Sequence, residues 1–198
     1  MTTVIIKYNA GNIFSVDYAL RRIGVHAKIT GHHDQIRNAD RVIFPGVGEA
    51  SSTMQYLKQH GLDTIICDLK QPVLGICIGM QLMCRYSEEG NTACMGIFDE
   101  SVMRFRSSQG VKVPHMGWNS LQNMRSPLFD GLHGNPFVYF VHSYYVGVSA
   151  FTVATSSHPC PFSAALQHGN FYALQFHPEK SGRVGELILK NFIKQTKC

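Results

Sequence analysis

Apolar residues in the first half of the chain occur in short continuous runs that alternate with helically spaced sets. Most of the runs are rich in Val and Ile, which is typical of strands buried on both faces of a parallel sheet. They predict strands at Thr3–Ile6, residues 27–29, Arg41–Phe44 and Val73–Ile76.

Between these runs the apolar residues have helical spacing. After the first strand and a turn over residues 9–12, one helical face is formed by Ile13, Val16, Leu20 and Ile23. Asn12 is the expected N-cap, and Gly24 follows the last turn. Further helices are predicted over residues 50–59, 63–69 and 80–85. This alternation predicts an α/β fold with a mostly parallel, doubly wound sheet and helices on both faces.

The second half has a different pattern. Short strand-like runs are separated by Gly, Pro, Asn and Ser, which predicts an antiparallel or mixed extension of the sheet. The runs cover residues 97–98, 137–141, 151–155, 162–166 and 171–176. A last helix is predicted over residues 181–194. Because no repeat or linker interrupts the pattern, we expect one domain over residues 1–198.

Composition and charge argue against several classes of protein. The chain is 44% hydrophobic and 16% charged, so it has enough apolar material for a buried core. Its longest apolar run, residues 73–80, is far shorter than a membrane span. The first residues lack a basic segment and a cleavage site, so we expect a cytoplasmic protein. The net charge of +5 is scattered rather than clustered, which argues against nucleic-acid binding.

The six cysteines have no Cys-x-x-Cys spacing, and the ten histidines have no zinc-finger spacing. We therefore expect thiols rather than disulfides or a metal site.

One cysteine lies in a pattern with chemical meaning. Gly75-Ile76-Cys77-Ile78-Gly79 places Cys77 between a predicted strand and a predicted helix, in the form of a nucleophile elbow. The tight turn would hold the sulfur exposed above the carboxyl edge of the sheet, where the helix N-terminus favours thiolate. The N–H of Ile78 would then be an oxyanion donor. The alternative is a buried strand end with turn glycines and no catalysis.

A base is available about a hundred residues later. His177 follows the predicted strand 171–176, at the kind of strand end where catalytic groups gather. Glu179 lies two residues on and is suited to orient the imidazole. Alone, this segment is also compatible with a metal site or a solvated turn. Together with the elbow, it predicts a nucleophile, a base and an orienting carboxylate.

These two segments, Gly-Ile-Cys-Ile-Gly-Met-Gln (75–81) and Phe-His-Pro-Glu (176–179), resemble the class I, triad-type glutamine amidotransferases. The resemblance implies a Cys77, His177 and Glu179 triad that hydrolyses glutamine through a thioester and releases ammonia for a partner enzyme. It also implies an oxyanion hole from Ile78 and the backbone near Val47 and Gly48. Read alone, Gly46-Val47-Gly48 would suggest a dinucleotide loop, but no third glycine follows at the required spacing.

Three further stretches, residues 8–12, 114–119 and 141–145, resemble one subfamily, the glutaminase subunits of imidazole glycerol phosphate synthases. The resemblance implies that Gln81, Ser143 and Tyr144 hold the glutamine. It implies no metal or organic cofactor. Lys7-Tyr8-Asn9 departs from the subfamily pattern, which more often has an acidic residue before the Tyr and a Gly after it.

The partner implied by this resemblance is a (β/α)8-barrel cyclase subunit. It makes imidazole glycerol phosphate and an aminoimidazole carboxamide ribotide in histidine biosynthesis. Asn12, Met116 and Trp118 are the residues we expect in a heterodimer interface, because an aromatic anchor is a typical interface hot spot. We also expect the Val47–Gly48 oxyanion strand to be misoriented until the partner binds its ligand.

Three alternatives remain open on the sequence alone. The chain could feed another synthase, such as anthranilate synthase, or a paralogous surface-sugar pathway. It could be a stand-alone cysteine peptidase or γ-glutamyl hydrolase that uses the same elbow. It could also be a binding module that has lost catalysis, although all three triad positions are intact.

Overall fold

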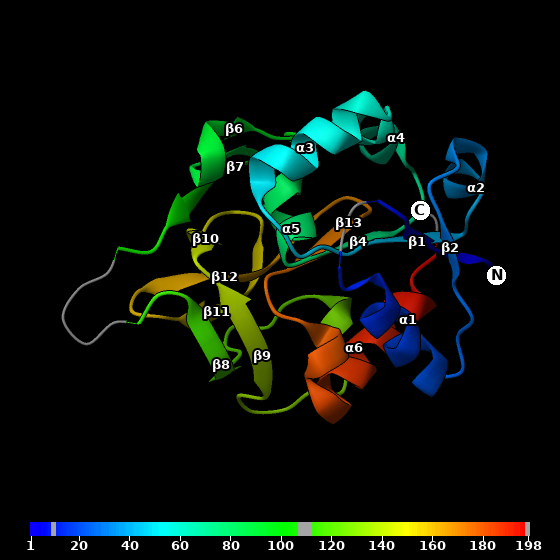
Figure 1. The fold of residues 1–198 in the computed structure, drawn as a ribbon. Helices are drawn as coiled ribbons and strands as arrows, with labels where there is room; N and C mark the ends of the chain where they lie inside the picture. The colour runs from blue at the N-terminus through cyan, green and yellow to red at the C-terminus, as the bar shows by residue number, and fades with distance from the viewer. Residues whose placement is uncertain (9–10, 107–111, 197–198) are drawn as a thin grey trace.

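A mixed sheet forms the centre of the computed structural model, which describes residues 1–8, 11–106 and 112–196 (Figure 1). Within these residues seven strands pair in the order β11-β12-β13-β4-β3-β1-β2. The strands from β2 to β13 run parallel, and β12 and β11 continue the sheet antiparallel. Their bounds are β1 Thr3–Ile6, β2 Lys28–Thr30, β3 Arg41–Phe44, β4 Val73–Ile76, β11 Thr152–Ser157, β12 Pro161–His168 and β13 Phe171–Leu174.

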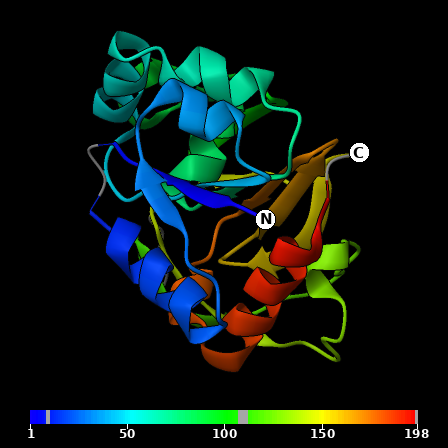
Figure 2. The same ribbon diagram turned by 90° about the vertical axis from the view of Figure 1, so that its right-hand side faces the viewer.

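Helices cover both faces of this sheet, as Figures 1 and 2 show. Helices α3, α4 and α5 lie over one face, and α1 and α6 lie over the other. Helix α2 lies beside the β2 edge. Their bounds are α1 Ile13–Arg22, α2 His33–Arg37, α3 Ala50–Gln59, α4 Leu62–Asp68, α5 Ile78–Met83 and α6 Gly182–Lys194.

Alternation along the central strands explains why two layers of helices form. Val42 and Phe44 pack into the cluster beneath α3 and α4, whereas Ile43 between them packs into the cluster beneath α1 and α6. Successive strand side chains point to opposite faces, so a continuous apolar run supplies both cores at once. The predicted fold class is thereby confirmed, including the antiparallel extension.

Two smaller sheets lie outside the main one. A four-stranded sheet pairs in the order β10-β7-β5-β6, and β8 pairs with β9 as an antiparallel ribbon. Their bounds are β5 Cys84–Ser87, β6 Thr92–Ala93, β7 Phe98–Arg104, β8 His115–Ser120, β9 Phe137–His142 and β10 Tyr144–Val146. Short 3-10 turns are η1 Glu89–Asn91, η2 Pro127–Phe129 and η3 Pro178–Lys180.

Several local predictions needed correction. The helix predicted over residues 80–85 begins earlier and ends at Met83, where the chain enters β5. Helix α2 and strands β6, β8 and β10 were not predicted at all. In the turn predicted over residues 9–12, residues 9 and 10 lie outside the described residues. Among the residues that the structure describes, no helix is both long enough and apolar enough to cross a bilayer.

The order of the parallel strands determines where a site can form. Strands β3, β4 and β13 are immediate neighbours and point the same way. The three segments that follow these strands therefore begin at the same edge of the sheet. Ligands bind at this edge in open α/β sheets. These segments contain Gly46, Cys77 and His177.

Candidate active site

Cys77 occupies the strained turn that its sequence pattern predicts. Its backbone has φ 54° and ψ −108°, in the positive-φ region that costs a non-glycine residue about 1–3 kcal/mol. The N–H of Cys77 donates to the carbonyl of Leu174 at 2.7 Å, which anchors the turn to β13. The sulfur is less exposed than predicted, because Cys77 is only 8% exposed. It faces a pocket and the carbonyl of Val141, which is 3.9 Å away.

The glycines around Cys77 allow the elbow to lie against neighbouring backbone. A Cβ at Gly79 would overlap the backbone oxygen of Phe44, and one at Gly46 would overlap the side chain of Ile78. A Cβ at Gly75 would lie 3.0 Å from the carbonyl carbon of Gly79. The pattern of glycines therefore permits α5 to start directly above β3 and β4.

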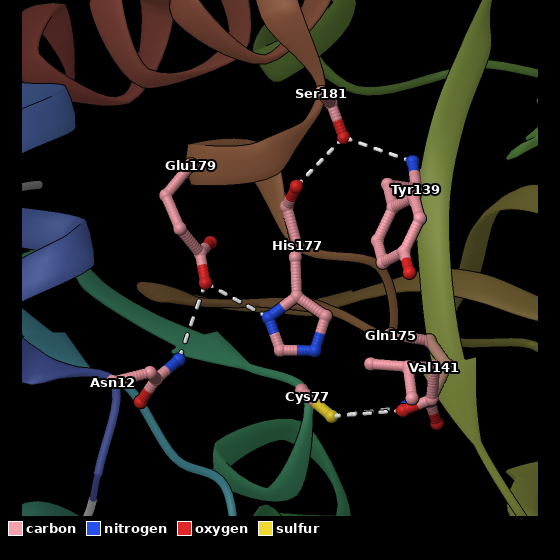
Figure 3. A network of polar contacts seen from close by, with 8 residues as sticks. All are labelled: Asn12, Cys77, Tyr139, Val141, Gln175, His177, Glu179 and Ser181. Atoms are coloured by element: carbon pink, nitrogen blue, oxygen red, sulfur yellow. Dashed lines mark hydrogen bonds and ion pairs between the residues drawn. The ribbon is translucent and has the colours of Figure 1, made fainter. Parts of the chain in front are cut away.

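His177 and Glu179 form a buried pair next to this elbow. Nδ1 of His177 lies 2.8 Å from Oε1 of Glu179, and both side chains are almost completely buried. Figure 3 shows Nε2 of His177 facing the sulfur of Cys77. The backbone of His177 is held by a bond from its N–H to the carbonyl of Tyr139, at 2.9 Å. Thus residues about a hundred positions apart meet in the order thiol, imidazole, carboxylate.

The charges of this group favour an imidazolium. Burial lowers the pKa of His177, but hydrogen bonds and negative charge from Cys77 and Glu179 outweigh burial and raise the pKa to about 10. A protonated ring beside the sulfur stabilises a thiolate. The ring of His177 therefore holds a proton beside the sulfur at neutral pH.

Asn12 adds a fourth member to the group. Its Nδ2 donates to Oε1 of Glu179 at 3.2 Å, across 167 positions of sequence. Asn12 stands at the N-cap position of α1, as predicted, but its side chain does not cap the helix. Asn12 is only 6% exposed, and its side chain points toward Glu179. It does not point outward, as we expected of an interface residue.

A pocket of about 300 Å³ opens above the sulfur. It is lined by every residue predicted for the oxyanion hole and for glutamine binding, together with Cys77. These residues are Val47, Gly48, Ile78, Gln81, Ser143 and Tyr144. Nδ1 of His142, also in the wall, lies 2.7 Å from the carbonyl oxygen of Tyr144. The geometry therefore brings all of these predicted residues together.

Glu89 also lines the pocket, and the sequence analysis missed it. It is half-buried in η1, where its Oε2 accepts from the N–H of Ala50 at 2.9 Å. Burial and the nearby Glu49 raise the pKa of Glu89, whereas the Ala50 bond lowers it. The adjacent Gly90, at φ 63°, is a turn signal, but nothing local indicates that the turn reaches the pocket.

Met116 and Trp118 lie on the β8–β9 ribbon, outside the pocket. They are 63% and 55% exposed, and Phe137 across the ribbon is 58% exposed. Figure 1 shows this ribbon beside α6. The three side chains form an exposed apolar group on one ribbon, which we call the ribbon patch.

Fold and site together have the form of a triad hydrolase, with a thiol on an elbow, a buried imidazole and a carboxylate at the carboxyl edge of a parallel sheet. The chain matches the family described as glutamine amidotransferase class-I over residues 4–196, and it belongs to that family. The predicted resemblance is confirmed.

Curated relatives agree with the narrower resemblance. The chain is 60% identical over 195 residues to "Imidazole glycerol phosphate synthase subunit HisH" of Bacteroides fragilis, which covers 98% of this chain and 100% of the relative. It is 43% identical over 199 residues to the protein of the same name from Idiomarina loihiensis, which covers all of both chains.

Solved structures share the fold. A crystal structure from Thermoplasma acidophilum, assigned to a component of GMP synthase, has a TM-score of 0.74 at 24% identity, covering 98% of this chain and 92% of its own. A crystal structure of a glutamine amidotransferase also has a TM-score of 0.74, at 17% identity, covering 96% of this chain and 97% of its own.

Proposed function

We propose that this amidotransferase hydrolyses glutamine through a thioester on Cys77 and delivers the ammonia to a cyclase subunit of imidazole glycerol phosphate synthase. The observation that carries the chemistry is the buried group of Cys77, His177 and Glu179 at one edge of the sheet. The observation that carries the pathway is the 60% identity to HisH subunits over nearly the full length. The family match over residues 4–196 supports a single amidotransferase domain.

The reaction follows from the positions of the three groups. The Cys77 thiolate attacks the side-chain amide carbon of glutamine, and the carbonyl oxygen becomes an oxyanion. The N–H of Ile78 and the backbone at Val47 and Gly48 stabilise that oxyanion. As the C–N bond breaks, His177 gives its Nε2 proton to the departing nitrogen, which leaves as ammonia.

Hydrolysis of the thioester regenerates the enzyme. Neutral His177 accepts a proton from water, whose oxygen attacks the acyl carbon, and the sulfur leaves as thiolate. Glutamate is released. Glu179 keeps the Nδ1 proton of His177 in place, so that Nε2 performs both transfers.

The pocket offers a group for each end of the amino acid. The Glu89 carboxylate suits the α-ammonium of glutamine, because it is the acidic side chain in the described pocket wall. Gln81, Ser143 and Tyr144 lie in the same wall and suit the remaining polar atoms. A volume of about 300 Å³ is compatible with one amino acid beside the sulfur.

The partner would dock on the ribbon patch. Exposed Met, Trp and Phe side chains are typical of interface cores. Strand β9 of the ribbon also supplies Tyr139, whose carbonyl accepts from the N–H of His177 and whose own N–H donates to Oγ of Ser181. Ser181 in turn donates to the carbonyl of His177 at 2.6 Å. Figure 3 shows this link, which gives docking a direct route to the triad.

Gating at the oxyanion strand would prevent wasteful hydrolysis. Gly48 has φ 145°, a conformation that side chains rarely adopt, so a peptide rotation there is inexpensive. Passing ammonia through a protected channel would keep it from becoming ammonium in water. We propose a cytoplasmic location for the complex and its lyase reaction, supported by free thiols at all five described cysteines.

Glutamate release from glutamine tests this proposal. The purified chain is assayed alone, with a cyclase subunit, and with that subunit and its ribonucleotide substrate. We expect large stimulation only in the last case. Trp118→Ala should weaken stimulation at least tenfold, as expected for an interface hot spot, whereas Phe14→Ala, exposed on α1, serves as the matched surface control. Full activity of the chain alone would instead indicate a stand-alone hydrolase.

A further inference from the structure

A completely buried carboxamide lies behind the pocket wall, in contact with both Cys77 and Gln81. Gln175 directly follows β13 and is 0% exposed. Its N–H donates to the carbonyl of Ala164 at 2.9 Å, which fixes the start of the side chain next to the elbow. Its Nε2 lies 3.9 Å from the sulfur of Cys77, and its Oε1 accepts from Nε2 of Gln81 at 3.0 Å. Figure 3 shows Gln175 near the sulfur of Cys77, on the side away from Glu179.

The direction of this amide is determined by its neighbours. The carbonyl oxygen of Tyr144 can only accept, so the atom of Gln81 that lies 3.1 Å from it must be Nε2. The same nitrogen is a donor toward Gln175, so the atom of Gln175 that meets it must be Oε1. The other end of that amide is therefore the NH₂ group, and it faces the sulfur.

We propose that Gln175 belongs to the catalytic site, with its Nε2–H group donating to the Cys77 thiolate and its Oε1 holding Gln81 in the pocket wall. This inference rests on the proposed role of Cys77 as nucleophile. It assigns two tasks to one buried side chain, one on the reacting sulfur and one on substrate binding.

Each task has a physical basis. A thiolate that is largely buried, as at Cys77, needs hydrogen-bond donors, because burial without them disfavours the charged form. Nε2 of His177 faces the sulfur from one side, and Nε2 of Gln175 approaches it from the end of β13. The NH₂ group of Gln81 donates to the carbonyl of Tyr144 and to Oε1 of Gln175. Its own Oε1 is therefore available to accept from a donor on the substrate. Without Gln175, Gln81 would lose one of the two contacts that hold its amide.

Two variants separate these tasks. Gln175→Glu keeps an oxygen toward Gln81 but places negative charge and no donor beside the sulfur. Gln175→Met keeps the volume and removes both polar contacts. Gln71→Met is the matched control, since Gln71 is a 3% exposed glutamine whose Nε2 donates to the carbonyl of Ile36. It lies before the amino end of β4, whereas Cys77 follows the carboxyl end.

The first readout is alkylation of Cys77 by iodoacetamide as a function of pH, followed by mass spectrometry of the Cys77 peptide. We expect Gln175→Glu to move the midpoint of the profile upward by about one pH unit and to slow alkylation at neutral pH about tenfold. Gln175→Met should move the midpoint upward by less, and Gln71→Met should leave it unchanged. Circular dichroism identifies variants that fold, and Gln175→Met carries the test if the Glu variant does not.

The second readout is glutaminase kinetics with the cyclase subunit and its substrate. Gln175→Met should raise the KM for glutamine roughly tenfold as Gln81 is released, which is about one hydrogen bond of binding. Wild-type midpoints and KM in a folded Gln175→Met variant would overturn the inference. If the wild-type chain hydrolyses no glutamine, the proposed function fails, but a shifted alkylation profile would still support the contact with sulfur.

Discussion

The carboxylate of Glu179 is held by two neighbours that approach the same oxygen. Nδ1 of His177 and Nδ2 of Asn12 both lie within hydrogen-bond distance of Oε1, at 2.8 and 3.2 Å. The first contact fixes which nitrogen of the ring faces the sulfur. The second limits how far the carboxylate can rotate, because Asn12 is itself held at the start of α1. At the scale of single residues, the triad is therefore a group of four.

Replacing Asn12 by Ala tests whether Asn12 positions the carboxylate of Glu179. A hydrogen bond to a charged group contributes about 1.5–3 kcal/mol, so we expect glutamine hydrolysis in the stimulated complex to fall roughly 10- to 100-fold. The loss should appear mainly in kcat, because Asn12 does not line the pocket. Asn191→Ala is the control: Asn191 is 4% exposed and bonded to the carbonyls of Leu128 and Asp130, so its loss should cost stability without changing kcat. A normal kcat in Asn12→Ala would restrict Asn12 to a packing role.

Cys77 itself gives the second prediction at this scale. Cys77→Ser should reduce glutaminase activity at least about 10³-fold, as removal of a nucleophile does in other triads. Because the sulfur is buried, Cys77→Ala should lower the free energy of unfolding by about 1 kcal/mol. Urea denaturation measures this change, and binding to the cyclase subunit should be retained. Activity that survives in both variants would exclude the thioester route.

At the scale of elements, the sequence predicted the bounds of strands and helices best where a continuous apolar run supplies buried side chains to both faces of a strand. Strands β1, β3 and β4 and helix α3 have the predicted bounds, because their apolar residues are contiguous or helically spaced. Helix α2 was missed because Ile36 is its one buried residue. Strand β8 was missed because Gly117 and polar residues interrupt its alternation.

The residues of the candidate site also divide into those that a local motif predicts and those that only the tertiary structure brings to the site. Cys77, His177 and Glu179 were found because each lies within a local motif. Glu89 could not be found, because its approach to the pocket depends on how η1 packs against α3. Asn12 was found for the wrong reason, since a contact across 167 positions leaves no local signal.

The elbow between β4 and α5 supports a prediction about an element. Gly79→Ala would drive a Cβ into the backbone oxygen of Phe44 on β3, and backbone cannot rotate aside as a side chain can. We expect a loss of about 3 kcal/mol in the free energy of unfolding, which for a chain of this length is a fall of about 6–12 °C in Tm. Gly147→Ala is the control, since its Cβ would lie 3.5 Å from a methionine methyl group. Equal Tm values in the two variants would contradict the packing argument.

At the scale of the whole molecule, a series of hydrogen-bonded side chains joins the β8–β9 ribbon to the wall of the pocket beside Cys77. Nδ1 of His142 must carry a proton, because it lies 2.7 Å from the carbonyl oxygen of Tyr144. Its Nε2 then accepts from Nδ1 of His115 at 2.9 Å. Nε2 of His115 accepts in turn from Nδ2 of Asn119, at 3.2 Å. Every step of this series requires both rings to be neutral.

Their titration should therefore control acid stability. Burial, followed by the charge of His158, lowers the pKa of His115 from 6.5 to about 4. Burial is also the largest cause that lowers the pKa of His142, to about 3. Because the folded pKa values lie below the unfolded value, both rings contribute stability that is present above pH 6.5. That stability declines as the pH falls toward 4 and 3.

His142→Asn isolates this effect, because the Asn amide can donate to the carbonyl of Tyr144 but does not titrate. We expect the variant to be less stable than the wild type at pH 7 and to lose less free energy of unfolding between pH 6.5 and 4.5. Urea denaturation at several pH values measures both slopes. His26→Asn, at an exposed position, should give a curve parallel to the wild type. If His142→Asn also gives a parallel curve, protonation of His142 does not govern the acid unfolding of the fold.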